Sequence, residues 1–506
     1  MRKQEFDGLR DFSFDRRLKR SLQDQLSKEI KQRILTARLL PETRLPSSRH
    51  LAQSLSVSRN TVNAALEQLK AEGYLKTRPG AGHYVSDEIP DNFLLTAPAK
   101  QAHTTPNESL KKPTQRTPLP LSSMGRTLSQ NKNTRQYGNS SFETGVPDLR
   151  AFPIQKWAPI YQRNNQRTSL MGYDQLQGYA PLREILADYL RSSRGLRCTA
   201  KQIIITAGAQ QAATIAVQIL LDKGDQAYVE NPGYIGLRKV LHAHGAHPVG
   251  IPVGEQGIDL SALPPQPSGK LLCLTPTHQY PMGGIIPLAK RLAILQWAAD
   301  HGVWLLEDDY DSEYHFDHKP IPAMQGLGLA EQVIYLGSFS KVLYPALRLG
   351  YLVVPEHLVD ACVTAKTCMT GQTALVEQAT TAEFIEAGHF VRHIRKMRVL
   401  YQEKQRAILA ACKKHLDDVA TPHYTGAGMH IVVTFHAELN RHGFQDVEVV
   451  DAMIRQGIYG SALSAYYLGQ PQHQGLVLGF ANTHAKAMHK KIKIIREVID
   501  SLIVKN

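Results

Sequence analysis

A lysine that ends a short apolar run near the middle of the chain could act as a nucleophile. The run VIYLGSFSK places Ser338 and Lys341 at its end, and Arg348 follows seven residues after the lysine. An amine held at the end of a strand can form a Schiff base with a carbonyl compound. The serine and the arginine would bind a phosphate group, the guanidinium through two parallel hydrogen bonds.

A second apolar run, VWLLEDDYDSE, ends in Asp308, Asp309 and Tyr310. A cofactor such as pyridoxal phosphate needs a carboxylate that keeps its pyridine nitrogen protonated, so that the ring withdraws electrons. Asp308 is placed for that role, and Tyr310 could form a hydrogen bond with the phenolate oxygen of the ring. The two runs together predict a pyridoxal phosphate site, with the cofactor bound as an internal aldimine to Lys341.

Two further segments could complete this site. IIITAGAQQAATIAV reads as a strand, a turn of small residues and a helix. The backbone amides of Gly208, Ala209 and Gln210 would lie at the helix N-terminus, where anions bind. ENPGY places Tyr234 where it could stack on the cofactor ring. All these groups would meet beyond the carboxyl ends of parallel strands, where open α/β sheets bind their ligands.

Each segment has another interpretation when it is taken alone. SFSK also fits the Ser-x-x-Lys motif of penicillin-recognising serine enzymes, but the chain contains no SDN or KTG motif. EDDYDSE could be a solvated acidic turn or a divalent-metal site. The histidine groups at 242–247 and 315–318 could also suggest a metal, but they lack a second cluster of ligands. We therefore predict no metal site.

The elements that must position these residues alternate between strands and helices. From Phe142 onward, runs such as IIIT, QAYVE and LLCLTP are separated by helical stretches, which indicates a mostly parallel sheet wrapped by helices. After about Phe384 a basic helix, HFVRHIRKMRVLYQEKQRAILAAC, precedes GAGMHIVVTF and LVLGFAN. We predict an α/β effector domain over 141–506, with a smaller α/β lobe over about 384–506.

The first 86 residues form a separate, basic block. They hold 17 Lys and Arg and 9 Asp and Glu, so their net charge of 17 − 9 = +8 is over half of the chain's +14. Such a charge favours a polyanionic partner. Apolar residues at every fourth position over 18–34 predict an amphipathic helix. Ser48–Leu55 predicts a second helix, and Ser58 is a good N-cap for a third helix from Arg59 to Ala71. YLKTRPGAGHYV predicts a hairpin.

This order of elements predicts a winged helix-turn-helix over 15–86 that binds a double-stranded DNA operator. The N-terminal end of the third helix would meet base edges in the major groove, and the hairpin would be the wing. A helical bundle with a solvated basic face is the alternative, but the order of two helices, a short turn, a capped helix and a glycine-rich wing disfavours it.

Between the two blocks, residues 87–140 are rich in Pro, Ser, Thr, Asn, Gln and Lys and contain hardly an aromatic residue. Such a segment cannot bury enough apolar area to order itself, so we predict a flexible linker with a reach of about 40 Å. No apolar run approaches the ~18 residues that span a bilayer, and the N-terminus lacks the apolar core of a signal peptide. Five cysteines without a CxxC pair point to reduced thiols. We expect a cytoplasmic protein without a membrane partner.

Both blocks resemble known families. LPSSRHLAQSLSVSRNTVNAALEQLKAEGYLKTRPGAGHYV resembles the GntR-type winged helix, and the chain from Phe142 to its end resembles fold-type I pyridoxal phosphate enzymes. Their combination, with TPTHQYPMGG and GAGMHIVV, resembles the MocR/GabR-type transcriptional regulators. With this resemblance, the candidates for contacts with the operator are Arg49, Ser58, Arg59, Asn60, Thr61, Asn63, Arg78, Gly80 and Gly82.

The resemblance also extends the set of cofactor-binding candidates. It implies that Tyr173, in MGYDQLQGYAPLREIL, reaches the cofactor phosphate of the partner subunit in a head-to-tail homodimer. The segment TPTHQYPMGG, which replaces the Asn-Pro-Thr-Gly of ordinary aminotransferases, adds His278. The full set of candidates is Lys341, Asp308, Tyr310, Ser338, Arg348, Tyr234, Gly208, Ala209, Gln210, Tyr173 and His278.

By this resemblance the chain is a regulator whose aminotransferase-like domain acts as a sensor of pyridoxal phosphate or of an amine or amino-acid effector. It is then not an enzyme, although a residual transaminase half-reaction could survive. The alternative is an active aminotransferase with an accessory DNA-binding domain. Two departures bear on the effector: Val477 stands where aminotransferases place an arginine for the substrate carboxylate, and Gly236 stands where GABA-responsive members place another. Our hypothesis is that the signal is pyridoxal phosphate itself or an amine without a carboxylate.

Overall fold

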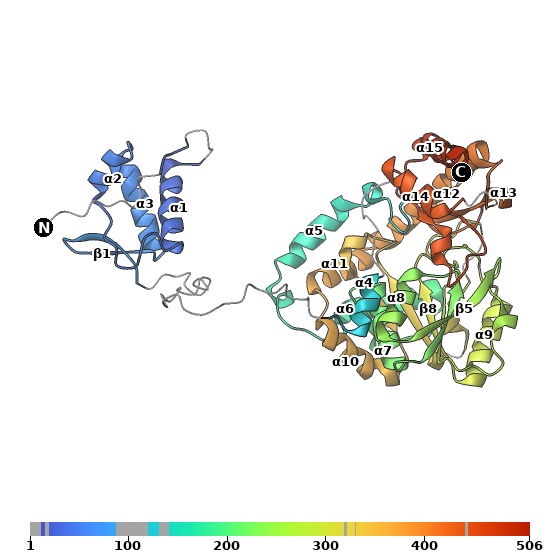
Figure 1. Ribbon diagram of the computed structural model, residues 1–506. Coiled ribbons are helices and arrows are strands. Elements are labelled where there is room, and N and C mark those ends of the chain that lie inside the picture. Colours follow the sequence, from blue (N-terminus) through green and yellow to red (C-terminus); the bar gives the residue numbers. More distant parts are fainter. Residues whose placement is uncertain are drawn as a thin grey trace, which may run out of the picture. The chain divides into compact units, whose positions relative to one another are not determined.

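The computed structural model describes residues 12–15, 20–87, 120–130, 141–317, 321–328, 330–440 and 444–505. The chain divides into two compact units, Met1–Pro118 and Leu119–Asn506 (Figure 1). Helix α4 (Ser123–Gln130) lies within the range that we assigned to the linker. In the part of the chain that is described, no helix is long and apolar enough to cross a membrane.

The smaller unit is a winged helix-turn-helix, as predicted. It consists of α1 (Leu22–Leu35), α2 (Ser48–Ser54), α3 (Arg59–Ala71) and the antiparallel strands β1 (Leu75–Arg78) and β2 (Gly82–Val85). Its core buries the apolar faces of α1 and α3, with Ile30 and Leu66 fully enclosed. At the N-terminus of each helix, a serine side chain accepts a hydrogen bond from a backbone N–H of the first turn, as Ser58 does from Thr61. The helix predicted from Leu18 begins at Leu22, and residues 16–19 lie outside the described ones.

The larger unit is built on an eight-stranded mixed sheet. The strand order is β3-β10-β9-β8-β7-β4-β5-β6, and β9, β8, β7, β4 and β5 run parallel. The run LGYLVV forms β10, which pairs antiparallel with both of its neighbours. The strands are β3 (Ile203–Thr206), β4 (Gln226–Asn231), β5 (His247–Gly254), β6 (Gly257–Ile258), β7 (Leu271–Leu274), β8 (Trp304–Asp309), β9 (Val333–Ser338) and β10 (Gly350–Val353).

Helices cover both faces of this sheet, so its central strands are buried on both sides (Figure 1). This is the mostly parallel α/β architecture that the alternating runs predict. The helices are α5 (Ile154–Asn165), α6 (Ala180–Arg194), α7 (Ala209–Leu220), α8 (Ile235–His244), α9 (Leu288–His301), α10 (Val359–Thr370) and α11 (Leu375–Glu386).

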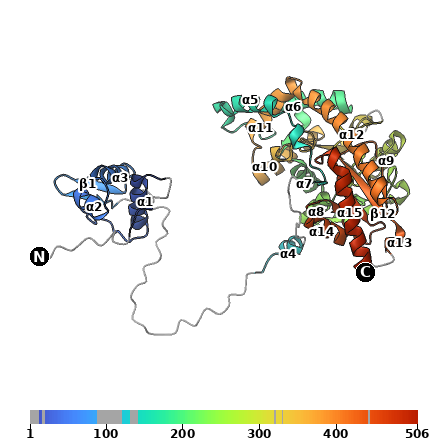
Figure 2. The same cartoon turned by 90° about the horizontal axis from the view of Figure 1, so that it is seen from above.

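The C-terminal part forms the smaller lobe around a four-stranded antiparallel sheet of order β11-β12-β14-β13. Its long helices α12 and α15 lie side by side, as Figure 2 shows. Its elements are α12 (His389–Leu416), β11 (Ala420–His423), β12 (His430–Phe435), α13 (Ala437–Asn440), α14 (Asp446–Arg455), β13 (Ser461–Ala462), β14 (Gly475–Gly479) and α15 (Ala485–Lys505). Phe142 bridges to Gly479, so the start of the effector domain also packs on this lobe.

Candidate functional site

The predicted DNA-contacting residues of α3 lie on its solvent side. Val62 and Leu66 face the core, whereas Arg59, Asn60 and Asn63 are exposed. The hydroxyl of Ser58 accepts a hydrogen bond from the backbone N–H of Thr61 at 3.1 Å and lies 2.8 Å from its hydroxyl. Ser58 therefore fixes the first turn of α3, and the exposed side chains of that turn remain available to a ligand.

Neighbouring elements orient the other candidates of this unit. The Arg59 guanidinium donates to the hydroxyl of Ser48 on α2 at 3.3 Å, and Arg49 is exposed on the same helix. In the wing, Arg78 pairs with Glu42 and lies over the ring of Tyr84, 4.6 Å from its centroid. The wing tip turns through two glycines of positive φ, Gly80 at 74° and Gly82 at 99°. Only glycine adopts this backbone without strain, and no side chain there blocks an approaching phosphate.

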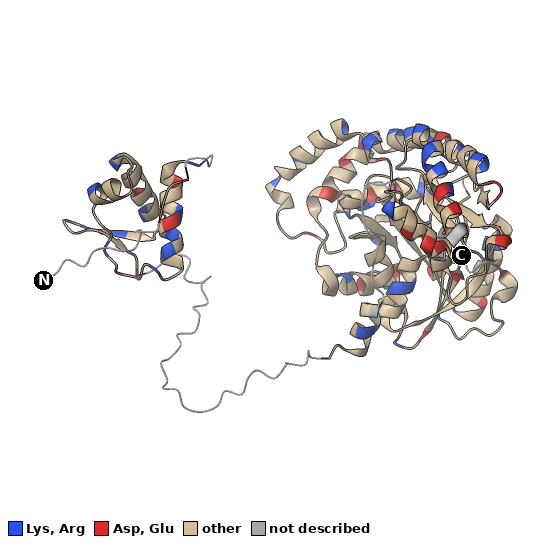
Figure 3. Cartoon of the chain, turned by 45° about the horizontal axis from the view of Figure 1, so that its top comes forward, with Lys and Arg blue, Asp and Glu red and all other residues tan. Residues whose placement is uncertain are grey.

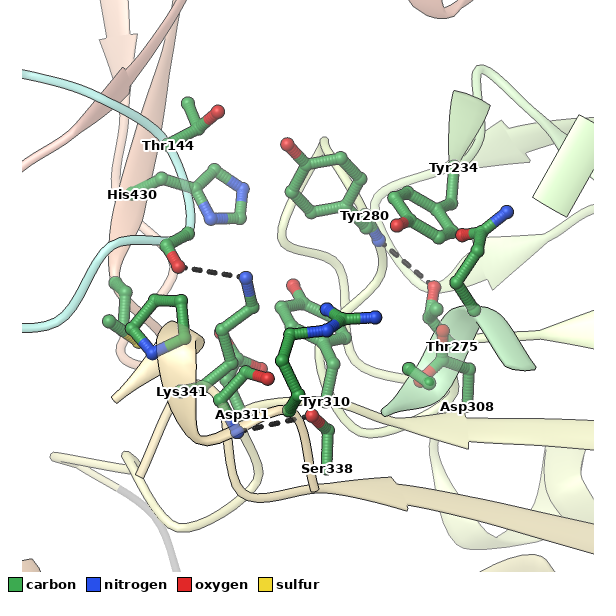
Figure 4. A pocket seen from close by; sticks show the side chains of 17 residues that line it. Thr144, Tyr234, Thr275, Tyr280, Asp308, Tyr310, Asp311, Ser338, Lys341 and His430 are labelled. Atoms are coloured by element: carbon green, nitrogen blue, oxygen red, sulfur yellow. Dashed lines mark hydrogen bonds between the residues drawn. The ribbon is translucent and has the colours of Figure 1, made fainter. Parts of the chain in front are cut away.

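In the larger unit, most of the cofactor-binding candidates surround one cavity of about 250 Å³. It lies beyond the carboxyl ends of β8 and β9, which run parallel with Asp308 opposite Leu336. Figure 4 shows the side chains of Lys341, Asp308 and Tyr234 converging on this space. Its walls include Ala209, Gln210, Tyr234, Asp308, Tyr310, Ser338, Lys341 and Arg348. Separate strand ends thus bring eight of the eleven candidates together.

The loop after β9 directs Lys341 into the cavity. Its Nζ atom donates to the carbonyl oxygen of Gly145 at 2.8 Å. Gly145 has a φ of 75°, and a Cβ atom there would lie 2.4 Å from that Nζ. The sequence did not predict Gly145 as a site residue, because it lies 196 positions from the lysine. Its backbone carbonyl and missing side chain together define where the amine lies.

Asp308 and Asp309 are adjacent in the sequence but differ in environment. Burial and the nearby Asp309 raise the pKa of Asp308 to about 7, against the effect of Lys341, and its Oδ1 atom has no hydrogen-bond partner. Asp309 does not line the cavity, and its Oδ2 atom lies 2.7 Å from Nε of Arg194. Burial would raise the pKa of Asp309, but Arg194 and the Tyr335 hydroxyl hold it below its usual value. Only Asp308 is placed to meet a ligand.

His278 lies behind the cavity wall. It is buried, it is absent from the cavity lining, and its Nδ1 atom lies 2.9 Å from the Tyr310 hydroxyl and 3.0 Å from Oδ2 of Asp311. Tyr310 itself lines the cavity. The structure therefore places His278 where it holds Tyr310, instead of in direct contact with a cofactor.

Arg348 brings a positive charge to the cavity wall. Gly208 is the N-cap of α7, and a Cβ atom there would meet the Arg348 guanidinium at 3.5 Å. Arg348 adopts a left-handed φ of 50° and has no carboxylate partner within the described ranges. An unpaired guanidinium beside a helix N-terminus favours a phosphate or carboxylate. Ser338 lines the same cavity.

Tyr173 stands apart from this cavity. Its side chain is 97% exposed, and it does not line the cavity of its own chain. Tyr234, by contrast, forms part of the wall, with its ring centroid 5.9 Å from that of Tyr280 and the two rings nearly perpendicular. The intersubunit role of Tyr173 therefore stays a prediction.

The cavity has further wall residues that the sequence reasoning missed, among them Thr144, Tyr280, Asp311 and His430. Burial and the neighbouring His278 lower the pKa of His430 to about 3, and its Nε2 atom lies 2.8 Å from the carbonyl oxygen of Pro281. His278, Asp311 and His430 have ligand atoms within 4.8 Å of one another and could hold a metal, whereas we predicted no metal site. GAGMHIVV was the available signal for His430.

Val477, predicted to stand where aminotransferases place an arginine, lies in apolar packing. Val477 is buried in a cluster with Val432 and Leu463, against which Tyr280 packs. At Gly236, a Cβ atom would lie 2.4 Å from the ring of Tyr234. Within the described ranges, Arg348 is the sole arginine of the cavity wall.

Comparisons with known proteins agree with both units. Residues 22–85 match the family of bacterial regulatory proteins called the gntR family, and residues 141–490 match aminotransferase class I and II. Among solved structures, the chain is similar to LysN, an α-aminoadipate aminotransferase of Thermus thermophilus that was complexed with N-(5'-phosphopyridoxyl)-L-leucine. The TM-score is 0.67 and the identity 25%, over 76% of this chain and 96% of that one.

Two named regulators match nearly the whole chain, and a transaminase matches about half of it. The chain is 37% identical over 481 residues to a probable rhizopine catabolism regulatory protein MocR of Rhizobium meliloti, a match that covers 94% of each chain. It is 31% identical to the HTH-type pyridoxine biosynthesis transcriptional regulator PdxR of Corynebacterium glutamicum, over 91% of this chain and 92% of that one. A 2-aminoadipate transaminase of Thermus thermophilus is 32% identical over 56% of this chain and 72% of its own length.

Proposed function

Because the chain belongs to the MocR-type transcriptional regulators, with a gntR-family winged helix joined to an aminotransferase class I and II domain, we propose that it is a DNA-binding regulator whose effector domain senses pyridoxal phosphate or an amine. The observation that carries the sensor role is the cavity in which Lys341, Asp308 and Arg348 converge.

The residues of the cavity fit pyridoxal phosphate. Asp308 has a buried, unpartnered oxygen in the wall, which suits a protonated pyridine nitrogen. Arg348 and the α7 N-terminus form an anion site that suits the phosphate. Lys341 supplies the amine, and Tyr234 supplies an aromatic face. When bound, the cofactor supplies an aldehyde that reacts with amines and a ring that withdraws electrons.

The surrounding residues would prepare this site for the cofactor. Gly145 orients the Lys341 amine through its carbonyl oxygen, and His278 holds the Tyr310 hydroxyl toward the position of the ring oxygen. Ser338 and the backbone amides of Ala209 and Gln210 would share the phosphate with Arg348. These roles follow from the chemistry of each group and its place in the cavity wall.

In the smaller unit we propose that α3 reads the operator with Arg59, Asn60, Thr61 and Asn63. Ser58 fixes the first turn of α3, while Arg49 on α2 and the wing with Arg78, Gly80 and Gly82 contact the phosphate backbone. We further propose a head-to-tail homodimer in which Tyr173 completes the partner's site, since its side chain extends into solvent on its own chain. A cytoplasmic location agrees with this function.

The arginines of the cavity wall bear on the choice between effectors. The phosphate of the cofactor would occupy Arg348, and no second arginine lines the described wall for the carboxylate of an amino acid. We propose that the signal is pyridoxal phosphate itself or an amine without a carboxylate. The name of PdxR refers to pyridoxine biosynthesis, so pyridoxal phosphate, a form of vitamin B6, is the first effector to test.

An active aminotransferase is the second candidate function. The Thermus 2-aminoadipate transaminase is similar to this chain over its effector domain, and the amine, the carboxylate and the anion site are all present. Efficient turnover, however, needs a substrate that is held in one orientation. The apolar cluster at Val477 provides no charge for that purpose.

The test uses the full-length protein saturated with pyridoxal phosphate. Borohydride should trap the cofactor on Lys341 and remove its visible absorption band, Lys341→Ala should abolish both, and the exposed-lysine variant Lys223→Ala should change neither. Gel shifts on DNA upstream of the protein's own gene should respond to pyridoxal phosphate. Failure to trap the cofactor on Lys341 would overturn the sensor, and repeated turnover with a keto acid would favour the enzyme.

A further inference from the structure

The charge of the effector domain is segregated. Residues 141–506 hold 35 Lys and Arg and 32 Asp and Glu, so the domain as a whole is nearly neutral. Helix α12 alone carries eight Lys and Arg against Glu403, and α15 carries six against Glu497 and Asp500. The rest of the domain therefore has 21 basic and 29 acidic residues. Figure 3 shows blue segments gathered along these two helices.

Six of the eight basic residues of α12 share one exposed face. At 100° per residue, the exposed positions of α12 recur every three or four residues along one side of the helix. We call this face the α12 stripe; it consists of Arg392, Arg395, Lys396, Val399, Glu403, Arg406, Ala410, Lys413 and Lys414. With a rise of 1.5 Å per residue, the stripe is about 33 Å long, which is close to one helical turn of B-form DNA.

Helix α15 widens the positive surface at the C-terminal end of the stripe. The rings of His415 and His489 meet across the two helices, with centroids 5.6 Å apart. Partial burial and the neighbouring charges of His489, Lys414 and Lys493 lower the pKa of His415. Lys414 on α12 and Lys493 on α15 therefore lie near the same histidine, and the two helices place their positive charges close together here.

Local stabilisation does not account for the stripe. Cations stabilise a helix at its C-terminus, which could explain Lys413 and Lys414. Arg392 donates to the carbonyl oxygen of Ala387 at the end of α11, but Arg395 and Lys396 lie in the second turn of α12, where neither role applies. Among the described residues, no acidic side chain within ion-pair distance neutralises Arg395, Lys396, Arg406 or Lys413. A row of exposed, unneutralised cations is costly to a compact fold unless a partner uses it.

We propose that the α12 stripe binds double-stranded DNA that flanks the sites of the winged helices. The inference rests on the proposed function, since the winged helix must first place the protein on DNA. The winged-helix block is itself basic, with 17 Lys and Arg against 9 acidic residues, so charge repulsion disfavours it as the occupant of the stripe. DNA has the required charge and the required length.

Such contacts carry no sequence information but add affinity and salt dependence, because each neutralised phosphate releases a counterion. They would also connect the small lobe, which forms part of the cavity wall, with the path of the DNA. The small lobe contributes His430 to the cavity wall and α12 to the DNA surface. A ligand that moves this lobe would therefore change the flanking contacts directly.

The experiment compares three full-length proteins saturated with pyridoxal phosphate: the wild type, a stripe variant and a matched control. The stripe variant carries Arg395→Gln, Lys396→Gln, Arg406→Gln and Lys413→Gln. The control removes four other cations of the effector domain through Arg197→Gln, Lys201→Gln, Lys223→Gln and Lys290→Gln. DNA upstream of the gene is footprinted first, and then one fragment trimmed to the winged-helix sites and one with 20 bp flanks (about two helical turns) are titrated.

The wild type should bind the long fragment more tightly than the short fragment, and log K should depend more steeply on log salt for the long one. The stripe variant should lose this difference, with a slope that is shallower by roughly 2 to 4, while it keeps the affinity of the wild type for the short fragment. Equal effects of the stripe and control variants, an unchanged slope, or a changed oligomeric state with unchanged DNA affinity would overturn the proposal. If the wild type leaves no footprint, the proposed function itself fails.

Discussion

The amine of Lys341 lies 2.8 Å from the carbonyl oxygen of Gly145, a residue near the start of the effector domain and 196 positions before the lysine. The segment that carries Gly145 begins at Phe142, which pairs with the small lobe at Gly479. The position of the amine therefore depends on a contact between the two lobes. A residue without a side chain is required at 145, because Lys341 occupies the space of a Cβ atom.

Gly145→Ala should displace Lys341. The new Cβ atom would lie 2.4 Å from Nζ, so the amine must leave its hydrogen bond, and we expect a several-fold loss of borohydride-trapped cofactor. Gly224→Ala is the matched control, because Gly224 also has a positive φ but has nothing within 4 Å of a Cβ atom. Both variants should lose about 1 kcal/mol of unfolding free energy through backbone strain. Equal trapping in the two variants would contradict the geometry.

Asp308→Asn and Asp309→Asn should separate binding from folding. Asp308 has an unpaired oxygen in the cavity wall, so its replacement should weaken cofactor binding at least tenfold and leave the thermal stability of the cofactor-free protein unchanged or higher. Asp309 pairs with buried Arg194, and breaking such a pair costs about 3–5 kcal/mol. Cofactor titration and urea unfolding measure the two effects, and a reversed pattern would refute the assignment.

Glu230 should make the cofactor-free protein less stable as the pH rises. Burial and the nearby Asp308 raise its pKa to about 7, against hydrogen bonds from Thr275. Between pH 4.5 and 7 the folded state therefore holds a proton that the unfolded state has released. The contribution of Glu230 to the unfolding free energy then falls by on the order of 1 kcal/mol per pH unit through this window.

Glu230→Gln should remove this contribution, since glutamine does not titrate. The difference in unfolding free energy between the variant and the wild type should rise from pH 5 to pH 7 and then level off. This difference is the quantity to measure, because the buried His393 and His430 titrate with the opposite slope, with pKa values lowered to about 4 and 3. A difference that does not change with pH would show that Glu230 is ionised throughout.

Much of the larger unit follows from local sequence patterns. Apolar runs such as VWLLEDD and VIYLGS form β8 and β9 because strands buried on both faces need continuous apolar residues. Their polar ends then meet at one edge of the sheet, which is why Asp308 and Lys341 could be paired without coordinates. The direction of β10 could not be predicted, because an apolar run is the same in a parallel and an antiparallel strand.

The missed features depend on contacts between distant segments. Nothing local to Gly145 indicates that it receives a hydrogen bond from a lysine 196 residues away. His278 was predicted as a cofactor-binding residue from its segment. Whether its side chain reaches the cavity or lies behind the cavity wall depends on how two loops pack, which the segment alone does not show. Helix α4 lies in a segment whose composition indicates a coil, since composition averages over the few residues that form a short helix.

Asn63→Ala should weaken operator binding without unfolding the winged helix. Asn63 is exposed on α3, one turn after the capped first residues, and makes no hydrogen bond among those found for the described residues. Loss of a bidentate contact with a base costs about 1–3 kcal/mol, a loss that unrelated DNA should not show. Glu67→Ala, one turn further along the same helix, is the matched control, since Glu67 contacts only Lys70 at the surface. Competition gel shifts against unrelated DNA measure this difference, and an equal loss on both DNAs would assign Asn63 to the phosphate backbone instead of a base.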